Sequence, residues 1–157
     1  MCSSDLESDQ ARTIDSFSFK WSKIPAYAHG ESTKRNREAW YLERFGFFDE
    51  AGLARSLRGA RRLLEAGTGT GVDTDFLTRN SSGTLYGVDA SGAIDHAFER
   101  FRHEPRVCLL QGDIGALPFE EDFFDVISCD QVLHHTPDPR AVFAHLVRHL
   151  RVGGRLL

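Results

Sequence analysis

Beyond residue 60, short apolar runs alternate with amphipathic stretches along the chain. Each run is short and mainly apolar, as in a strand buried on both faces, and the runs fall at residues 63–66, 85–88, 107–110 and 124–129. Stretches of helical period lie between some of them, at residues 71–79 and 92–102. This alternation predicts a parallel sheet with right-handed crossovers and helices on both faces. In such a sheet a ligand binds at the carboxyl ends of the strands.

The end of the chain predicts one more helix and one more strand. We expect the helix over residues 137–151, with Thr136 as its N-cap and an apolar stripe along one face. Gly153 and Gly154 then turn the chain into a fifth strand of only three residues, 155–157. Because so short a strand would leave the edge of its neighbour poorly covered, we expect the chain to be truncated and the sheet to be incomplete at its C-terminus.

The segment before the first strand carries a different pattern. Residues 1–16 are polar and without periodicity, so we expect them to be disordered. Residues 17–27 hold four aromatic side chains, which predict either packing on the main core or a lid over the ligand site. Helices are expected over residues 32–45 and 49–57, so that residues 17–58 form an aromatic and helical N-terminal cap.

Composition sets the class of protein and excludes several partners. The 157 residues carry a formal net charge of -4 without a dense Lys or Arg cluster, which argues against a nucleic-acid or anionic-membrane surface. No run approaches the roughly 20 apolar residues of a membrane span, and no signal peptide is recognisable, so we expect a cytoplasmic chain with one core domain over residues 59–157. The three cysteines are widely spaced, which favours neither disulfides nor a zinc site. We expect Cys108 and Cys129 to be small core residues.

The first predicted strand is followed by a glycine-rich turn, with an acidic residue and three glycines at alternate positions: Glu65, Gly67, Gly69 and Gly71. Such a turn at the head of a helix exposes backbone N–H groups and lets a ligand approach the backbone closely. We therefore expect a nucleotide-like cofactor. A dinucleotide fingerprint needs a third glycine where Val72 stands, so the spacing disfavours an NAD-type cofactor.

Two further acidic residues follow the next two strands. Asp89 ends the second strand, where its carboxylate can accept hydrogen bonds from both hydroxyls of a ribose. As an isolated turn residue it would instead cap the following helix, a role for which Ser91 competes. Asp113 follows the third strand and can accept a hydrogen bond from an adenine amino group while Ile114 packs on the ring. The alternative for Asp113 is an ordinary turn aspartate.

Together these motifs resemble, in order and spacing, those of the class I S-adenosylmethionine-dependent methyltransferases. The chain is similar to the small-molecule type, which includes the ubiquinone and menaquinone biosynthesis enzymes, over nearly the whole stretch from Leu63 to Leu157. In addition to the glycine-rich turn, the resemblance rests on Gly112-Asp113, Leu117-Pro118-Phe119, Phe124-Asp125-Val126-Ile127, Val132-Leu133-His134-His135 and Gly153-Gly154. It implies a Rossmann-like, doubly wound α/β fold, S-adenosylmethionine as the methyl donor and a small-molecule acceptor.

Carried over by position, the resemblance also implies roles for particular residues. The three glycines would approach the cofactor through their backbone, Glu65 would lie near its methionine moiety, Asp89 would hold the ribose, and Asp113 with Ile114 would frame the adenine. Asp130 and Gln131 follow the fourth strand, where the family brings donor and acceptor together. The cofactor-binding residues that we expect are Glu65, Gly67, Thr68, Gly69, Gly71, Asp89, Ala90, Asp113, Ile114 and Asp130.

The chemistry of methyl transfer asks the protein for alignment and for proton removal. The sulfonium of S-adenosylmethionine is already an activated donor, so the acceptor has only to be placed in line with the methyl group and deprotonated where necessary, without a metal. His134 and His135 are candidate bases and Asp130 is a further catalytic candidate, although paired histidines at such a junction are as often capping and packing groups. His145 and His149 lie four residues apart without a third ligand, so we expect surface or partly packed roles for them.

Two alternatives come from other classes. An NAD-dependent oxidoreductase would share the strand-loop-helix architecture, although Val72 counts against it. A non-catalytic S-adenosylmethionine-binding fragment is the other, because the family's domain normally continues past the fifth strand with strands that complete the sheet. The sequence identifies neither the acceptor nor the oligomeric state.

Overall fold

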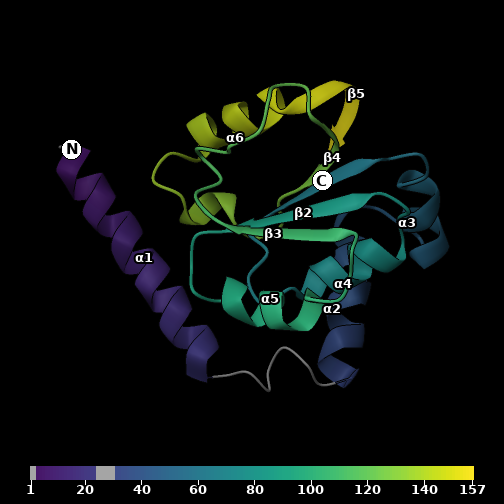
Figure 1. Ribbon diagram of the computed structural model, residues 1–157, viewed down its shortest axis with the longest axis horizontal. Coiled ribbons are helices and arrows are strands. Elements are labelled where there is room, and N and C mark those ends of the chain that lie inside the picture. Colours follow the sequence, from purple (N-terminus) through teal and green to yellow (C-terminus); the bar gives the residue numbers. More distant parts are fainter. Residues whose placement is uncertain (1–2, 24–30) are drawn as a thin grey trace.

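The computed structural model describes residues 3–23 and 31–157, and the side chains of residues 10–20 and 34–157. Its centre is a five-stranded parallel sheet with the strand order β3-β2-β1-β4-β5 (Figure 1). The strands are β1 (Arg62–Ala66), β2 (Thr84–Asp89), β3 (Val107–Gln111), β4 (Phe124–Ser128) and β5 (Leu150–Leu156). The chain runs outward from β1 to β3 and returns to β4 on the other side of β1, so the strand order reverses there. Ligands bind at such reversal points in open α/β sheets.

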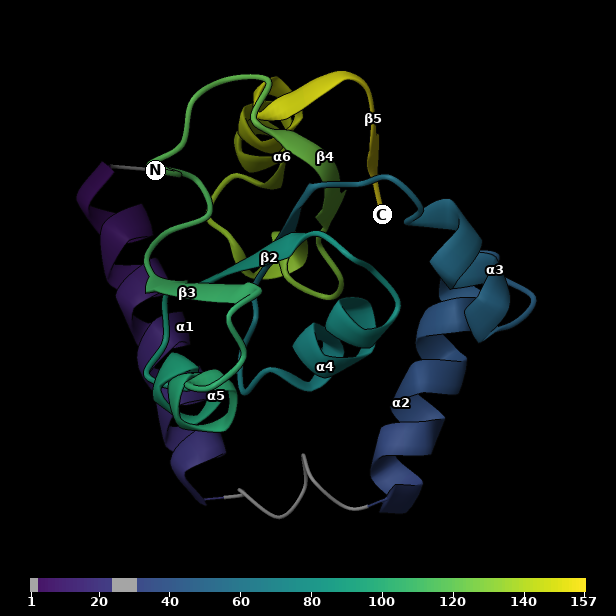
Figure 2. The ribbon, with the colours of Figure 1, turned by 45° about the vertical axis from the view of Figure 1, so that its right-hand side comes forward.

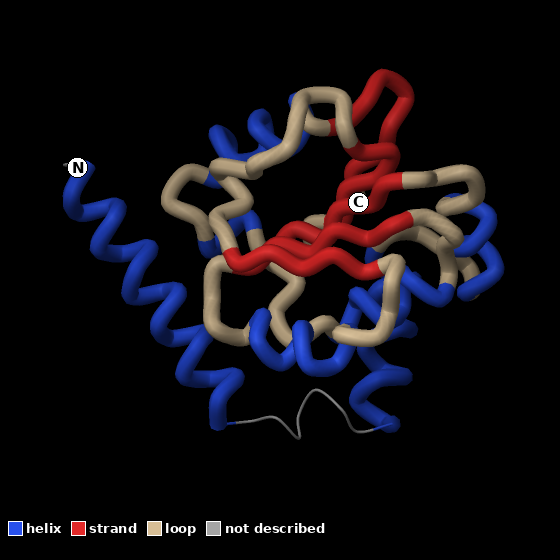
Figure 3. Tube along the Cα trace, in the orientation of Figure 1, coloured by secondary structure: helices blue, strands red, loops and turns tan. Residues whose placement is uncertain are grey.

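Helices cover both faces of the sheet, as the ribbon shows from two directions (Figures 1 and 2). One face carries α4 (Val72–Arg79) and α5 (Ile94–Phe101), with α2 (Glu31–Arg44) and α3 (Glu50–Ser56) beside α4. The other face carries α6 (Pro139–Arg148) and the 3-10 turn η2 (Leu133–His135). The tube in Figure 3 shows the sheet as the middle layer. The doubly wound α/β fold that the sequence predicts is confirmed.

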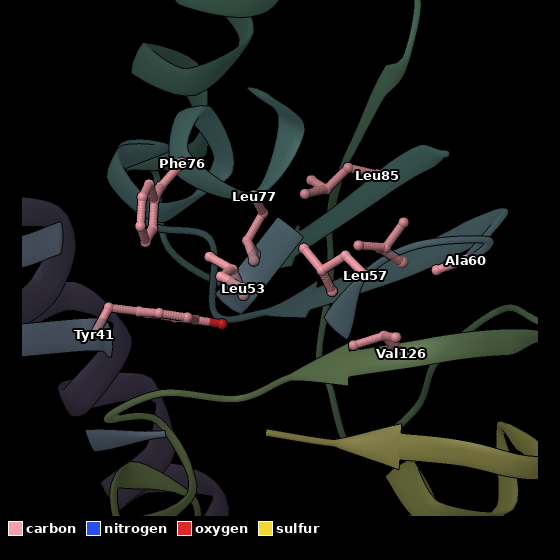
Figure 4. Packing of buried hydrophobic residues seen from close by; sticks show 9 residues of the cluster. Tyr41, Leu53, Leu57, Ala60, Phe76, Leu77, Leu85 and Val126 are labelled. Carbon is pink, nitrogen blue, oxygen red and sulfur yellow. The ribbon is translucent and has the colours of Figure 1, made fainter. Parts of the chain in front are cut away.

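Two clusters of buried side chains hold the layers together. Alternate residues of a strand point to opposite faces, so Leu63 of β1 faces one cluster and Leu64 faces the other. The first cluster joins the sheet to α2, α3 and α4 through Tyr41, Leu53, Leu57, Ala60, Leu63, Phe76, Leu77, Leu85 and Val126 (Figure 4). The second cluster joins the sheet to α6 through Val142 and Leu146.

The predicted strands and helices up to β4 lie within two residues of their expected bounds, whereas the last helix ends at Arg148, three residues before its expected end, and has a different N-cap. The N-cap of α6 is Asp138, whose side chain accepts a hydrogen bond of 3.0 Å from the backbone N–H of Ala141. Thr136, the expected cap, donates its hydroxyl to the carbonyl oxygen of Leu133 at 2.7 Å. The hydroxyl is therefore used to close η2 and not to begin α6.

The fifth strand also differs from the prediction, because it begins at Leu150, directly after α6, and contains both glycines. Leu150 pairs with Phe124 and Arg155 pairs with Val126, so residues 151–154 bulge out of the ladder opposite one residue of β4. Gly153 has a φ of +75°, a left-handed conformation that glycine tolerates and that bulges often contain.

The N-terminal residues differ from the expectation of disorder, since residues 3–16 belong to the helix α1 (Ser3–Lys23). Cys108 is exposed, contrary to expectation, because β3 is an edge strand, and Cys129 is half-buried. Of the helices in the described part of the chain, none is long and apolar enough to cross a bilayer. The boundary between cap and core at residue 59 stays a prediction.

Candidate functional site

A cavity of about 510 Å³ opens at the carboxyl ends of the strands. The loops after β1, β2, β3 and β4 line it, together with residues of α1 and α2. Its volume lies in the range of small-molecule and cofactor sites, about 300–1,000 Å³. The lining contains every expected cofactor-binding residue except Gly71: Glu65, Gly67, Thr68, Gly69, Asp89, Ala90, Asp113, Ile114 and Asp130. The topology thus gathers side chains that four separate strands deliver.

The glycine loop presents its backbone to this cavity. Gly67 and Gly69 have φ values of +88° and +54°, in the left-handed region that favours glycine. A Cβ atom at Gly67 would lie 2.1 Å from a methyl group of Val132, so the loop after β4 approaches too closely for a side chain. A Cβ atom at Gly69 would meet no atom of the described residues within 4 Å. The backbone at Gly69 is therefore open to a ligand.

Gly71 lies outside the cavity lining and has a different role from the expected one. It is the N-cap of α4, with a φ of +79°. A Cβ atom there would lie 2.5 Å from Cε2 of Phe101 on α5. Glycine at this position permits close packing between the start of α4 and α5.

Asp89 does not cap the following helix, because the N-cap of α5 is Ala93; its carboxylate is bound by the loops after β1 and β2. Its Oδ2 accepts a hydrogen bond of 2.7 Å from the backbone N–H of Gly69, and its Oδ1 accepts from the N–H and the hydroxyl of Ser91, at 2.8 Å and 2.6 Å. A carboxylate has about four lone-pair sites. Three are in use, so Oδ2 retains one acceptor site for a ligand hydroxyl.

Asp113 faces the cavity from the loop after β3. Its Oδ1 accepts a hydrogen bond of 2.8 Å from the backbone N–H of Gly115, which is the expected turn geometry. Its Oδ2 accepts from Nε2 of Gln10 on α1, at 3.1 Å. Ile114, beside it, is 5% exposed. A polar edge and an apolar face therefore adjoin at this end of the cavity.

Glu65 is a buried acid, with 5% of its surface exposed. Its Oε2 accepts a hydrogen bond of 2.5 Å from the hydroxyl of Thr74. Burial raises the pKa of Glu65 well above its ordinary value, and the negative charges of Asp73 and Asp89 add to this rise, while Thr74 and Arg37 oppose it. A cation placed next to Glu65 would favour its ionised form.

The sequence patterns did not indicate that residues of α2 line the cavity. Arg37 donates to both carboxylate oxygens of Asp73, at 3.1 Å and 2.6 Å, and to Oδ2 of Asp130 at 3.0 Å. Arg44 donates to Oδ1 of Asp130 at 3.0 Å, and Trp40 lies against both guanidinium groups. Arg37, Trp40 and Arg44 recur at helical spacing, which is the signal that would have placed them on one face. Each oxygen of Asp130 accepts a hydrogen bond from an arginine of α2, so this residue anchors α2. Its catalytic and cofactor-binding roles stay predictions.

Of the paired histidines, His135 lines the cavity and His134 does not. The ring of His135 lies 4.9 Å from that of Phe17 and 3.9 Å from that of His134, measured between centroids. Burial lowers the pKa of His135, and the neighbouring His134 and Lys20 lower it further. A neutral imidazole is thereby available on the cavity wall at neutral pH.

The described part of the aromatic segment lies over the cavity. Phe17 lines it, and the hydroxyl of Ser18 accepts a hydrogen bond of 3.0 Å from the backbone N–H of Gly92. Phe19, by contrast, is 66% exposed. The position of Phe17 agrees with the second expectation for this segment, a lid over the ligand site. The side chains of residues 21–27 lie outside the described part of the chain.

His145 and His149 lie away from the cavity and are packed against the loop after β3. His149 is 4% exposed and its ring centroid lies 4.5 Å from that of His145. Within residues 3–23 and 31–157, no group of three or more His, Cys, Asp or Glu side chains is placed to hold a metal ion.

The residues around the cavity fit a polar, cationic cofactor. The buried hydroxyl oxygen of Thr70, which lines the cavity, has no hydrogen-bond partner among the described residues, so it is left for a ligand. The open backbone at Gly69 leaves room for close approach. The carboxylates of Asp89 and Asp113 provide acceptors and a negative field that suits a sulfonium and an ammonium group, and such a cation would favour the ionised form of Glu65 as well.

Comparison with known proteins gives the family. A family model described as a methyltransferase domain matches residues 64–157. An uncharacterized 37.1 kDa protein in transposon TN4556 of Streptomyces fradiae is 33% identical over 130 residues, 76% of this chain and 38% of that protein. Phthiotriol/phenolphthiotriol dimycocerosates methyltransferase 1 of Mycobacterium ulcerans is 35% identical over 98 residues, 62% of this chain and 36% of that protein.

Solved structures agree with these relatives. The structure of the trans-methyltransferase CalH in complex with SAH (S-adenosylhomocysteine) is 28% identical and superposes with a TM-score of 0.56, over 66% of this chain and 32% of that one. The chain spans about a quarter to two fifths of the length of the curated relatives that it matches.

Proposed function

Because the chain belongs to the methyltransferase domain family, we propose that it binds S-adenosylmethionine in the cavity and transfers the methyl group to a small-molecule acceptor by in-line displacement. One observation carries the proposal. One cavity is lined by Glu65 of β1, Asp89 at the end of β2 and Asp113 after β3, together with the open backbone of Gly69. A Rossmann-like sheet places the parts of an extended nucleoside ligand along this edge.

In this proposal each acid meets a different part of the cofactor. Glu65 lies toward the methionine moiety, Asp89 offers its remaining lone pair to a ribose hydroxyl, and Asp113 with Ile114 frames the adenine. Thr68 and Ala90, on the same loops, complete the contacts. When bound, S-adenosylmethionine supplies a methyl group that its positive sulfonium already activates. Gly71 contributes to packing and not to binding.

The acceptor side of the cavity is formed by residues of α1, α2 and η2. Phe17 and Trp40 offer aromatic surfaces, and His135 stands at the edge of Phe17. In our proposal the aromatic walls orient the acceptor and exclude water. Where the methyl group is received by a hydroxyl or an amine that must lose a proton, the neutral imidazole of His135 takes up that proton.

Labelled methyl transfer tests this function. The chain is incubated with S-adenosylmethionine labelled in its methyl group and with a cell extract that has been separated by size. We expect label in the small-molecule fraction. Label only in protein or nucleic acid would contradict the acceptor class, and cofactor binding without transfer in any fraction would favour the non-catalytic alternative. Cytoplasmic location stays a prediction from the sequence.

A further inference from the structure

The loop between β3 and β4 is fastened to α6 by two histidines that lie outside the cavity. Nε2 of His145 accepts a hydrogen bond of 3.1 Å from the backbone N–H of Leu117. Nε2 of His149 lies 3.1 Å from the carbonyl oxygen of Phe119. Both anchored residues follow Asp113 by a few positions. The two histidines therefore hold the loop that carries Asp113, and they do so from outside the cavity.

The hydrogen bond from the loop requires a neutral His145. An imidazole nitrogen accepts a hydrogen bond only while it carries no proton. Burial lowers the pKa of His145, and the charges of His149 and of Arg148 lower it further. When Nε2 of the neutral ring accepts from Leu117, the ring proton is on Nδ1. The exposed guanidinium of Arg148, whose Nη2 lies 3.1 Å from Nδ1, then acts on the ring as a charge and not as a hydrogen-bond donor. The negative charges of Asp113 and Glu121, which belong to the same loop, act in the opposite direction. The net direction favours the neutral ring at neutral pH.

Protonation of His145 would turn Nε2 into a donor that faces the N–H of Leu117, and this contact would be lost. The ring of His149 lies beside that of His145, with 4.5 Å between the centroids. Its Nδ1 lies 2.9 Å from the carbonyl oxygen of His145 and its Nε2 lies 3.1 Å from that of Phe119, so His149 ties the same loop to α6.

Apolar packing couples the loop to the same helix. Leu117 and Ile114 belong to the buried cluster that contains Val142 of α6. Gly115 lies so close that a Cβ atom there would be 3.4 Å from Cγ2 of Val142. A change at the histidines is therefore transmitted to the residues on either side of Gly115.

We propose that His145 is a positioning residue for the adenine end of the cavity: its neutral imidazole holds Leu117, and through it the loop that carries Asp113 and Ile114. This role rests on the proposed binding of S-adenosylmethionine. It gives cofactor affinity a proton-dependent component that originates outside the cavity. The component is complete where His145 is neutral and is lost as the pH falls through the pKa of His145, which lies below the ordinary 6.5.

Replacement of His145 by Gln separates positioning from titration. The amide oxygen of Gln can accept the N–H of Leu117 at every pH, whereas His145→Phe removes the acceptor. S-adenosylhomocysteine is titrated calorimetrically into each protein at about pH 7.5 and about pH 5.5. We expect His145→Gln to match the wild type at the higher pH. At the lower pH the wild type should lose about three- to tenfold more affinity than His145→Gln, as for one lost hydrogen bond.

Two comparisons complete the experiment. His145→Phe should bind about three- to tenfold more weakly than the wild type at the higher pH, and its affinity should lack the extra loss at the lower pH. His96→Gln, at an exposed position of α5, should keep the wild-type pH profile, because it removes a histidine that does not touch the loop. Other groups that titrate in the cavity affect all four proteins equally.

The same pH profile in the wild type and in His145→Gln would overturn this role while leaving the proposed function intact. Failure of every protein to bind S-adenosylhomocysteine would overturn the proposed function and the role with it. The contact itself is tested without ligand, by following the Leu117 amide in NMR spectra of the wild type. We expect its resonance to titrate with His145; a resonance that stays constant over this pH range would contradict the contact.

Discussion

The carboxylate of Asp89 accepts a hydrogen bond of 2.7 Å from the backbone N–H of Gly69. Asp89 ends β2 and Gly69 lies in the loop after β1, so this bond joins two neighbouring loops at the mouth of the cavity. The same carboxylate retains one lone-pair site toward a ligand. Asp89 thus shapes the glycine loop and offers an acceptor at the same time.

Asp89→Asn should weaken S-adenosylhomocysteine binding by about tenfold or more, because a charged acceptor is lost and an amide N–H replaces one of its oxygens. The side chain keeps its size, so we expect the fold to persist. Calorimetry gives the affinity, and circular dichroism verifies the fold. Asp95→Asn, at an exposed position of α5, serves as the matched control and should bind like the wild type. A dissociation constant within twofold of the wild type in Asp89→Asn would remove this residue from the site.

The buried acid Glu65 should make the stability of the chain depend on pH. Burial raises the pKa of Glu65 well above its ordinary value of 4.5, so between that value and the raised pKa the folded chain holds a proton that the unfolded chain has released. This stabilising contribution is complete below about pH 4.5 and is lost as the pH rises, with a slope of at most about 1.4 kcal/mol per pH unit.

Glu65→Gln cannot ionise, yet it can still accept the hydrogen bond from Thr74. Its free energy of unfolding, measured with urea, should therefore fall less between about pH 5 and about pH 8 than that of the wild type. Glu99→Gln, at an exposed position, should follow the wild type. Parallel pH profiles for Glu65→Gln and the wild type would show that Glu65 is already ionised in the folded chain.

Arg37 should stabilise the fold through its ion pairs with two acidic residues. Its side chain joins α2 to Asp73 and to Asp130, whose carboxylate is 4% exposed. Arg37→Ala leaves both acids with fewer partners, and we expect a loss of about 2–3 kcal/mol in the free energy of unfolding. Arg35→Ala on the exposed side of the same helix should cost much less. Equal losses in the two variants would contradict the anchoring role.

The two glycines Gly69 and Gly71 should respond differently to substitution. Gly71→Ala forces a Cβ atom against Phe101 at a positive φ, and we expect it to cost about 2–4 kcal/mol of stability. Gly69→Ala meets no described neighbour and should cost about 1–2 kcal/mol, yet weaken S-adenosylhomocysteine binding. Denaturation and calorimetry on both variants test this contrast, which equal effects in both assays would contradict.

Local sequence patterns were enough to predict the sheet and the acidic residues at its edge. The apolar runs mark the strands, and the carboxyl ends of parallel strands share one edge, so Glu65, Asp89 and Asp113 had to lie near one another. Nothing in the local pattern separated Gly71 from the other two glycines. Its neighbour Phe101 lies 30 positions further along, and only the packing of α5 against α4 brings the two together.

Contacts between distant segments also explain what the sequence did not reveal in the N-terminal region. The polar α1 gives little periodic signal, and several of its described contacts are made with segments far along the chain. Gln10 reaches Asp113 across 103 positions. At Thr136 two local possibilities competed, and the hydrogen bond within η2 decided between them.

Calorimetric titration of the wild-type chain with S-adenosylhomocysteine tests the central claim most directly. The account predicts saturable binding at one site per chain, displacement by S-adenosylmethionine, and no binding of NADH. A folded chain that gives no binding heat with S-adenosylhomocysteine at several temperatures, or that binds NADH in its place, would contradict the claim that this cavity holds the methyl donor.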